Sequence, residues 1–176
     1  MKKTIIAMLL FSSLANAQIT KGNWMVGGNA FFDNTTSKDN GGNEYPSTTQ
    51  IIIAPNIGYF IYDKFSSGLG TRLYYAKTKG NSSSNSGFGI GPFVRYYFLK
   101  PEKTINILIE ANYSYNKDFN QSDFNTSYGF KAGPVIYFNT SVGLELLAKY
   151  EHTYSSSSYT SNSFQIGLGF QIHLEK

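Results

Sequence analysis

The side chains that could do chemistry in this chain are few. Its 176 residues include two histidines and eleven acidic residues, and cysteine is absent. The absence of cysteine excludes a disulfide framework, a thiolate metal site, a cysteine nucleophile and an anchoring lipid on an N-terminal cysteine. Any acid–base or nucleophilic chemistry must therefore use histidine, hydroxyl, amine or carboxyl groups.

Glu151 and His152, followed by four serines at positions 155–158, form the one stretch that resembles hydrolytic machinery. Such residues at the edge of a membrane could modify the acyl chains of a lipid. In an extended segment, however, Glu151 and His152 point to opposite faces, and no nucleophile-elbow, metal or phosphate motif accompanies them. We predict that the protein is not an enzyme and that His152 is an interfacial side chain; a lipid-modifying enzyme is the third hypothesis.

Residues 39–44, with the sequence DNGGNE, hold oxygen ligands of the kind that calcium prefers. Their spacing does not fit the EF-hand loop, and a flexible turn explains them. The sequence therefore predicts no metal site and no cofactor.

Eight charged residues form a set at alternate positions of extended segments. They are Arg72, Arg95, Glu110, Lys131, Glu145, Lys149 and Glu151, with Asp33 nearer to a loop. Four cations and four anions can neutralise one another on one surface. Arg95 and Glu110 are expected to pair, because only a short turn separates their segments.

Eight segments with period-two alternation must position these charges. They span 23–33, 50–61, 67–78, 87–99, 104–116, 127–138, 142–154 and 163–174. Each is long enough for a tilted strand to cross a bilayer, which takes roughly 9–11 residues. We predict an all-β fold, an eight-stranded antiparallel up-and-down transmembrane β-barrel. Long polar connections alternate with short turns, as expected when loops lie outside the cell and both termini lie in the periplasm.

The two faces of the segments differ in composition. In the last segment one phase reads Phe164, Ile166, Leu168, Phe170, Ile172 and Leu174, and over all eight segments this phase has one charged side chain, Lys77. The other phase carries the charges and twelve of the seventeen glycines. A soluble, lipocalin-type barrel would place the apolar phase inside, but its outside should then be densely hydrophilic. Small residues suit the inside of a narrow barrel, so the apolar phase is predicted to face lipid.

The inward charges allow two interpretations. They could form a gate or selectivity network that opens a narrow path for small solutes. Alternatively, they form a mutually satisfied polar core, because an eight-stranded barrel has room for little besides side chains. We favour the polar core, and hence a plugged lumen; the narrow pore is the alternative function.

Three segments share a small residue followed by proline: Ala54-Pro55, Gly91-Pro92 and Gly133-Pro134. Proline cannot donate a ladder hydrogen bond, so β-bulges are expected at these sites. The repeat indicates hairpin duplication and no ligand site.

The first seventeen residues resemble a signal peptide. Lys2 and Lys3 precede a short apolar region, and Ala15 and Ala17 form a small-x-small cleavage site. The predicted organisation is a signal peptide over 1–17 and a barrel domain over 18–176. Loss of the two lysines lowers the formal charge from +4 to +2, and the remaining cations are scattered, so no nucleic-acid partner is predicted.

The segment from Gly22 to Leu174 resembles the outer-membrane β-barrel family, the small OmpA/OmpX-type barrels. The most specific feature is a C-terminal pattern of polar, glycine, aromatic and hydrophobic positions, filled here by Gln165, Gly167, Phe170 and Ile172. The resemblance implies recognition by the barrel-assembly machinery and residence among the lipids of the bacterial outer membrane, but it fixes no activity.

The leading functional hypothesis is a structural or surface-interaction role through the extracellular loops. A partner outside the cell could bind aromatic side chains in these loops. The candidates are Tyr45, Phe119, Phe124 and Tyr159, which could equally pack on the barrel rim.

Overall fold

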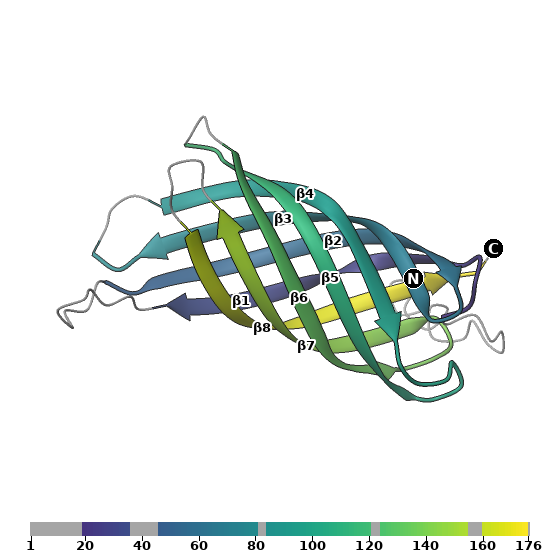
Figure 1. The fold of residues 1–176 in the computed structure, drawn as a ribbon. Coiled ribbons are helices and arrows are strands. Elements are labelled where there is room, and N and C mark those ends of the chain that lie inside the picture. The colour runs from purple at the N-terminus through teal and green to yellow at the C-terminus, as the bar shows by residue number, and fades with distance from the viewer. Residues whose placement is uncertain (1–18, 36–45, 81–83, 121–123, 155–159, 176) are drawn as a thin grey trace, which may run out of the picture.

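A single closed sheet makes up the protein. The computed structural model describes residues 19–35, 46–80, 84–120, 124–154 and 160–175. Its strands are β1 (Trp24–Thr35), β2 (Thr48–Tyr62), β3 (Phe65–Thr78), β4 (Ser84–Tyr97), β5 (Ile105–Asp118), β6 (Phe124–Tyr137), β7 (Val142–Tyr154) and β8 (Thr160–Leu174). Each strand pairs antiparallel with its neighbours in the chain, and β1 pairs with β8 to close the barrel (Figure 1). The predicted fold class is confirmed.

The strands extend beyond the predicted segments mainly at the end with the long loops. β4 begins at Ser84, β6 at Phe124 and β8 at Thr160, each three residues before the start expected from hydrophobic alternation. Alternation reports where one face of a strand meets lipid, whereas backbone pairing needs no apolar face. The ladders therefore continue beyond the apolar band into polar sequence. None of the described residues forms a helix that could span a membrane.

The burial of side chains follows the predicted phases. In β8, Gln165 is 1% exposed whereas the adjacent Ile166 is 70% exposed. The outer surface carries isoleucine, leucine, phenylalanine and tyrosine. The charged residues buried inside are Arg95, Glu110, Asp118, Lys131, Glu145, Lys149 and Glu151. An apolar exterior around a charged interior is the reverse of a soluble barrel, and it matches a barrel immersed in lipid.

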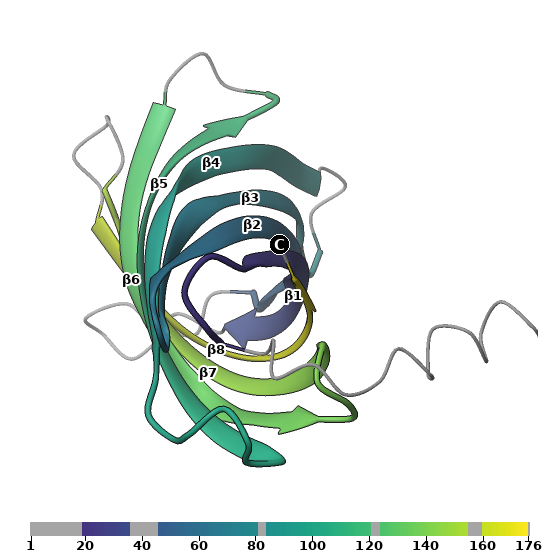
Figure 2. The same cartoon turned by 90° about the vertical axis from the view of Figure 1, so that its right-hand side faces the viewer.

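The chain before β1 covers one mouth of the barrel. Figure 2 views this mouth, where the purple segment leading into β1 curls across the opening. Ile19 is fully buried there, and its carbonyl oxygen accepts a hydrogen bond of 2.8 Å from the backbone amide of Lys64. A second hydrogen bond, from the Gly22 amide to the Phe60 carbonyl oxygen, measures 2.9 Å. The segment therefore belongs to the fold and closes the end of the barrel that carries the short turns.

The expectation of bulges at the three prolines is wrong. The ladder is interrupted beside Pro55 (β2–β3), Pro92 (β4–β5) and Pro134 (β6–β7), but the same register resumes on both sides of each gap. The register shift among the described strand pairs lies elsewhere, between Phe60 and Tyr62. Proline thus removes a hydrogen bond on one side without adding a residue to the strand.

The glycine before two of these prolines has a specific role. A Cβ atom on Gly91 would lie 1.8 Å from the carbonyl oxygen of Tyr113, and one on Gly133 would lie 1.8 Å from that of Leu146. The hydrogen that takes the place of Cβ at each glycine therefore points at this carbonyl oxygen, which belongs to the neighbouring strand that pairs with the proline's strand. This Cα–H···O contact partly replaces the amide hydrogen bond that proline cannot make. Close backbone approach explains the glycine–proline repeat.

Candidate functional site in the barrel interior

A row of charged side chains crosses four adjacent strands on the inner face. The registers place Arg95 of β4 opposite Glu110 of β5, Glu110 opposite Lys131 of β6, and Lys131 opposite Lys149 of β7. Residues paired in this way share a face of the sheet. The Arg95–Glu110 pair expected across the short turn is present.

Arg95 is the centre of the first charge cluster. Its guanidinium binds two carboxylates, Glu110 at 2.7 Å and Glu145 at 2.6 Å, and its side chain is fully buried. Lys131 binds the second oxygen of Glu110 at 2.9 Å. Two cations and two anions are thus tied together away from solvent. Removing one member of such a set leaves its partners charged and buried, which typically costs about 3–5 kcal/mol.

Asn29 of β1 closes this cluster across the lumen. Its amide nitrogen donates to Glu145 at 3.0 Å, and its amide oxygen accepts from the Lys131 ammonium at 2.5 Å. The residue is 3% exposed. Sequence reasoning missed Asn29 because it carries no charge; its inward phase in the first strand was the available signal.

A second charge cluster lies nearer the long loops. Glu151 of β7 binds both Arg72 of β3 and Lys149 of its own strand through its two carboxylate oxygens. Asp118, at the end of β5, is also buried on the inner face. The sequence analysis missed Asp118 because it ended that strand two residues too early.

Two cavities meet at the Arg72–Glu151 pair. An internal cavity of about 60 Å³ lies below it, with Phe93, Asn112 and Lys131 in its wall. A more open vestibule of about 200 Å³ lies above it, with Asn116, Asn125 and Ser163 in its wall. Arg72 and Glu151 line both spaces. The internal cavity has room for a few water molecules, and charged and polar side chains form part of its wall.

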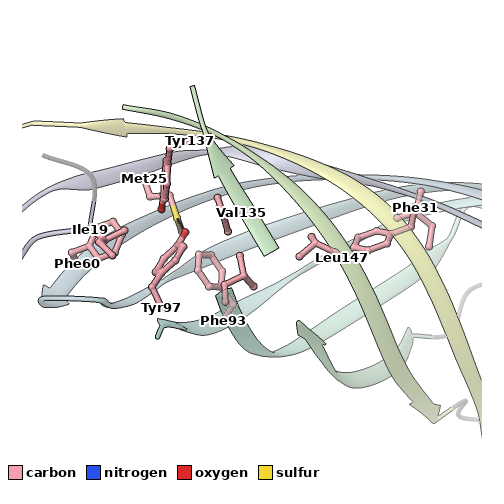
Figure 3. Close-up of a cluster of buried hydrophobic side chains, with 11 residues drawn as sticks. Ile19, Met25, Phe31, Phe60, Phe93, Tyr97, Val135, Tyr137 and Leu147 are labelled. Carbon is pink, nitrogen blue, oxygen red and sulfur yellow. Dashed lines mark hydrogen bonds between the residues drawn. The ribbon is translucent and has the colours of Figure 1, made fainter. Parts of the chain in front are cut away.

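Below the Arg95 cluster, an aromatic floor fills the periplasmic end. Figure 3 shows Ile19 and Phe60 packed beside Tyr97, with Tyr137 and Met25 close by. The ring of His173 contacts those of Phe60, Tyr97 and Tyr137 at centroid distances of 5.5, 6.1 and 5.7 Å. Tyr97 links the floor to the charges, because its hydroxyl accepts a 3.1 Å hydrogen bond from Arg95.

The residues that suggested hydrolytic chemistry are separated. Glu151 is buried inside, whereas the ring of His152 lies on the outer surface between Tyr128 and Tyr154. The Nδ1 atom of His152 is 2.6 Å from the side-chain oxygen of Asn162. Serines 155–158 and the possible calcium-binding residues 39–44 lie outside the described residues. Within the described ranges, no group of three or more histidine, aspartate or glutamate side chains is placed to hold a metal ion.

The C-terminal pattern lies on β8, beside the closing strand β1. Gln165 and Gly167 face the interior, and Phe170 and Ile172 face outward. Of the loop aromatics, Phe119 stacks on Phe88 at 6.1 Å, and the Lys117 ammonium lies 5.1 Å from the centre of the Phe124 ring. Tyr45, Tyr159 and the predicted cleavage residues Ala15 and Ala17 are outside the described part of the chain.

An apolar outer face, a closed ring of eight strands and a charged interior define a small transmembrane β-barrel. The chain belongs to the family described as "Outer membrane protein beta-barrel domain", whose sequence profile matches residues 4–176. This family places the protein in the bacterial outer membrane.

Two solved structures are similar to this barrel. Neisserial surface protein A has 16% sequence identity and a TM-score of 0.65, over 86% of this chain and 97% of that one. The outer membrane protein OprG from Pseudomonas aeruginosa has 13% identity and a TM-score of 0.53, over 90% and 99%. Identities this low support the fold alone. A comparison with curated protein sequences gave no match.

Proposed function

We propose that the protein is a plugged barrel with a structural or surface-interaction role, carried out through its extracellular loops. The observation that carries this proposal is the double closure of the lumen. The Arg95 cluster fills the middle, and Ile19 with the aromatic floor fills the periplasmic end. A barrel closed in two ways has no continuous path for solute, so the loops are the part left to act.

Planar-bilayer recording tests the closure. The refolded barrel should give no reproducible unit conductance, and liposomes that contain it should not swell in small sugars. A unit conductance that changes in Arg95→Ala or Glu110→Ala would overturn the plugged lumen. To test the loops, whole cells should be treated with protease: cleavage should occur within the long connections while the barrel stays protected.

A narrow pore is the second candidate function. Its supporting observation is that the paired Arg72 and Glu151 line both the vestibule and the internal cavity. Movement of this pair would lengthen the aqueous path, although the lower closure would still have to open. If the Arg72→Ala variant conducts ions while the aromatic floor and Ile19 are left unsubstituted, the pore is favoured.

Biogenesis forms a further part of the proposal. We infer that residues 1–17 are removed as a signal peptide and that Gln165, Gly167, Phe170 and Ile172 form the signal read by the barrel-assembly machinery. Cleavage after Ala17 would make Ile19 the second residue of the mature chain. The buried position of Ile19 supports this site, because the mature chain would then begin next to the mouth that Ile19 closes. Mass spectrometry of the protein extracted from outer membranes tests this, since the mature chain should begin at Gln18.

A further inference from the structure

A groove lies on the outer surface at the extracellular ends of β2 and β3. Its volume is about 550 Å³. Ile51 and Tyr75 form its lower part, Ser47 and Thr49 lie on one side, and Lys77 and Lys79 lie at its rim. The lower part belongs to the apolar, lipid-facing surface, whereas the upper part is cationic. The groove therefore extends from the lipid-facing apolar surface to the charged residues just beyond it.

The two lysines have no carboxylate partner among the described residues. Lys77 and Lys79 are both exposed, and the described ion pairs all involve interior side chains. Lys77 is also the single charged residue in the predicted lipid-facing phase. Because no described carboxylate neutralises them, the two lysines can attract an anionic ligand.

The two rims of the barrel differ in charge. At the extracellular rim, the described outer surface has Lys77, Lys79 and Lys117, while Asp118 and Glu151 are buried on the inner face. At the periplasmic rim the exposed charges are mixed. They include Lys21, Lys100 and Lys103 together with Asp63, Glu102 and Glu175. Among the described residues, the outer surface of the extracellular rim thus carries cations without exposed anions, whereas the periplasmic rim carries both signs.

The backbone at the groove is held in place. The hydroxyl groups of Thr48 and Thr78 hydrogen-bond at 2.9 Å across the strand pair. The Lys79 amide donates to the Ser47 carbonyl oxygen, also at 2.9 Å. These bonds keep the two lysines over the extension of β3, directly above Tyr75. The site is therefore formed without a ligand.

We propose that this groove binds an outer-leaflet lipid with a phosphorylated head group. Lys77 and Lys79 contact the phosphate, and the upper end of an acyl chain lies along Ile51 and Tyr75. Cationic side chains at a membrane surface attract anionic lipid head groups, and the apolar floor distinguishes a lipid from a free anion. The occupant is thus an anionic amphiphile, with charge complementarity above and apolar contact below.

Native mass spectrometry of the intact barrel in detergent tests the proposal, with diphosphorylated lipid A as the probe. The test variant is Lys77→Gln/Lys79→Gln. The matched control is Lys100→Gln/Lys103→Gln, which removes two lysines from the opposite rim. Each lysine near a membrane surface contributes about 1 kcal/mol to anionic-lipid binding, so the test variant should bind the lipid roughly thirtyfold more weakly. The control should bind as the unmodified barrel does.

Four results would overturn the proposal. One is equal binding by the test variant, and another is an equal loss in the control, which would reflect total charge alone. The third is undiminished binding of lipid A from which both phosphates have been removed. Inorganic phosphate at millimolar concentration should not displace the lipid; if it does, the site recognises an anion and not a lipid. As a folding control, both variants should migrate differently in SDS gels before and after boiling, because a closed barrel resists the detergent until it is heated.

Discussion

Buried ion pairs lie in both halves of the lumen, but the surroundings of these charges differ. On the extracellular side, Arg72 retains 13% side-chain exposure and lies beside an open vestibule. On the periplasmic side, Arg95 has no exposure and lies above rings and Ile19. Water in the vestibule can solvate the Arg72 cluster when a partner moves, whereas Arg95 and Glu145 line neither cavity.

This difference separates two roles for buried charge. A charge cluster in a dry site must remain complete, because the loss of one partner leaves an unpaired ion at low dielectric. A cluster beside water tolerates the loss of a partner, because solvent screens what remains. The periplasmic half is therefore expected to determine stability, and the extracellular half to control access to the interior.

Arg95→Ala should have the largest effect. It leaves Glu110 and Glu145 buried without their shared cation, so the free energy of unfolding should fall by about 3–5 kcal/mol. Urea unfolding of the barrel in phospholipid vesicles measures this loss. Adding Glu110→Gln and Glu145→Gln to Arg95→Met should recover part of it. If the triple variant is no more stable than Arg95→Ala, unpaired charge is not the cause.

Ile19→Ala should have the next largest effect. Truncating a buried isoleucine costs 2–5 kcal/mol, and about 2 kcal/mol is expected here because the site lies near a chain end that can adjust. The same urea experiment measures it. Ile61→Ala, on the lipid-facing surface, is the control and should cost less. An equal loss in the control would mean that Ile19 is not part of a packed floor.

Asn29→Ala should have an intermediate effect. It removes the hydrogen bonds to Glu145 and Lys131 while both charges keep another partner, so a loss of about 1–3 kcal/mol is expected. Asn125→Ala, in the vestibule, should change the unfolding free energy by less than about 0.5 kcal/mol. Similar losses at the two asparagines would abolish the distinction between the dry and wet halves.

Arg72→Ala should have the smallest effect on stability, about 1 kcal/mol, because the vestibule supplies water to Glu151. The main consequence of Arg72→Ala should be easier entry of small molecules from the vestibule into the internal cavity. The chain has no cysteine, so Asn112→Cys, in the wall of the internal cavity, can report entry of a thiol reagent from outside. The thiol reagent should label Asn112→Cys slowly when Arg72 is present, and it should label the double variant Asn112→Cys/Arg72→Ala faster. As a control, Ser163→Cys in the vestibule should be labelled rapidly with or without Arg72→Ala. Equally rapid labelling of Asn112→Cys while Arg72 is present would show that the Arg72–Glu151 pair is not a barrier.

The sequence predicted the features that depend on which face of a strand meets lipid. The alternation around Ile166 and Gln165 specifies both the barrel and the inward charges, because burying charge in lipid is costly. It could not show that Asn29 bridges two charges or that Ile19 closes a mouth. Those contacts join residues far apart in the chain, and only the closed register brings them together. The proline sites were located correctly, but their geometry depends on the partner strand, which the local sequence does not describe.

The buried position of Ile19 has a practical consequence for engineering the protein. An affinity tag or fluorescent label fused just before this residue would start beside the mouth that Ile19 closes, so it needs a spacer that leaves the buried side chain in place. The C-terminal end of β8 lies at the same mouth, so a fusion there needs a spacer. The long connections at the opposite rim are the better insertion sites, because they leave the packed floor of the barrel unchanged.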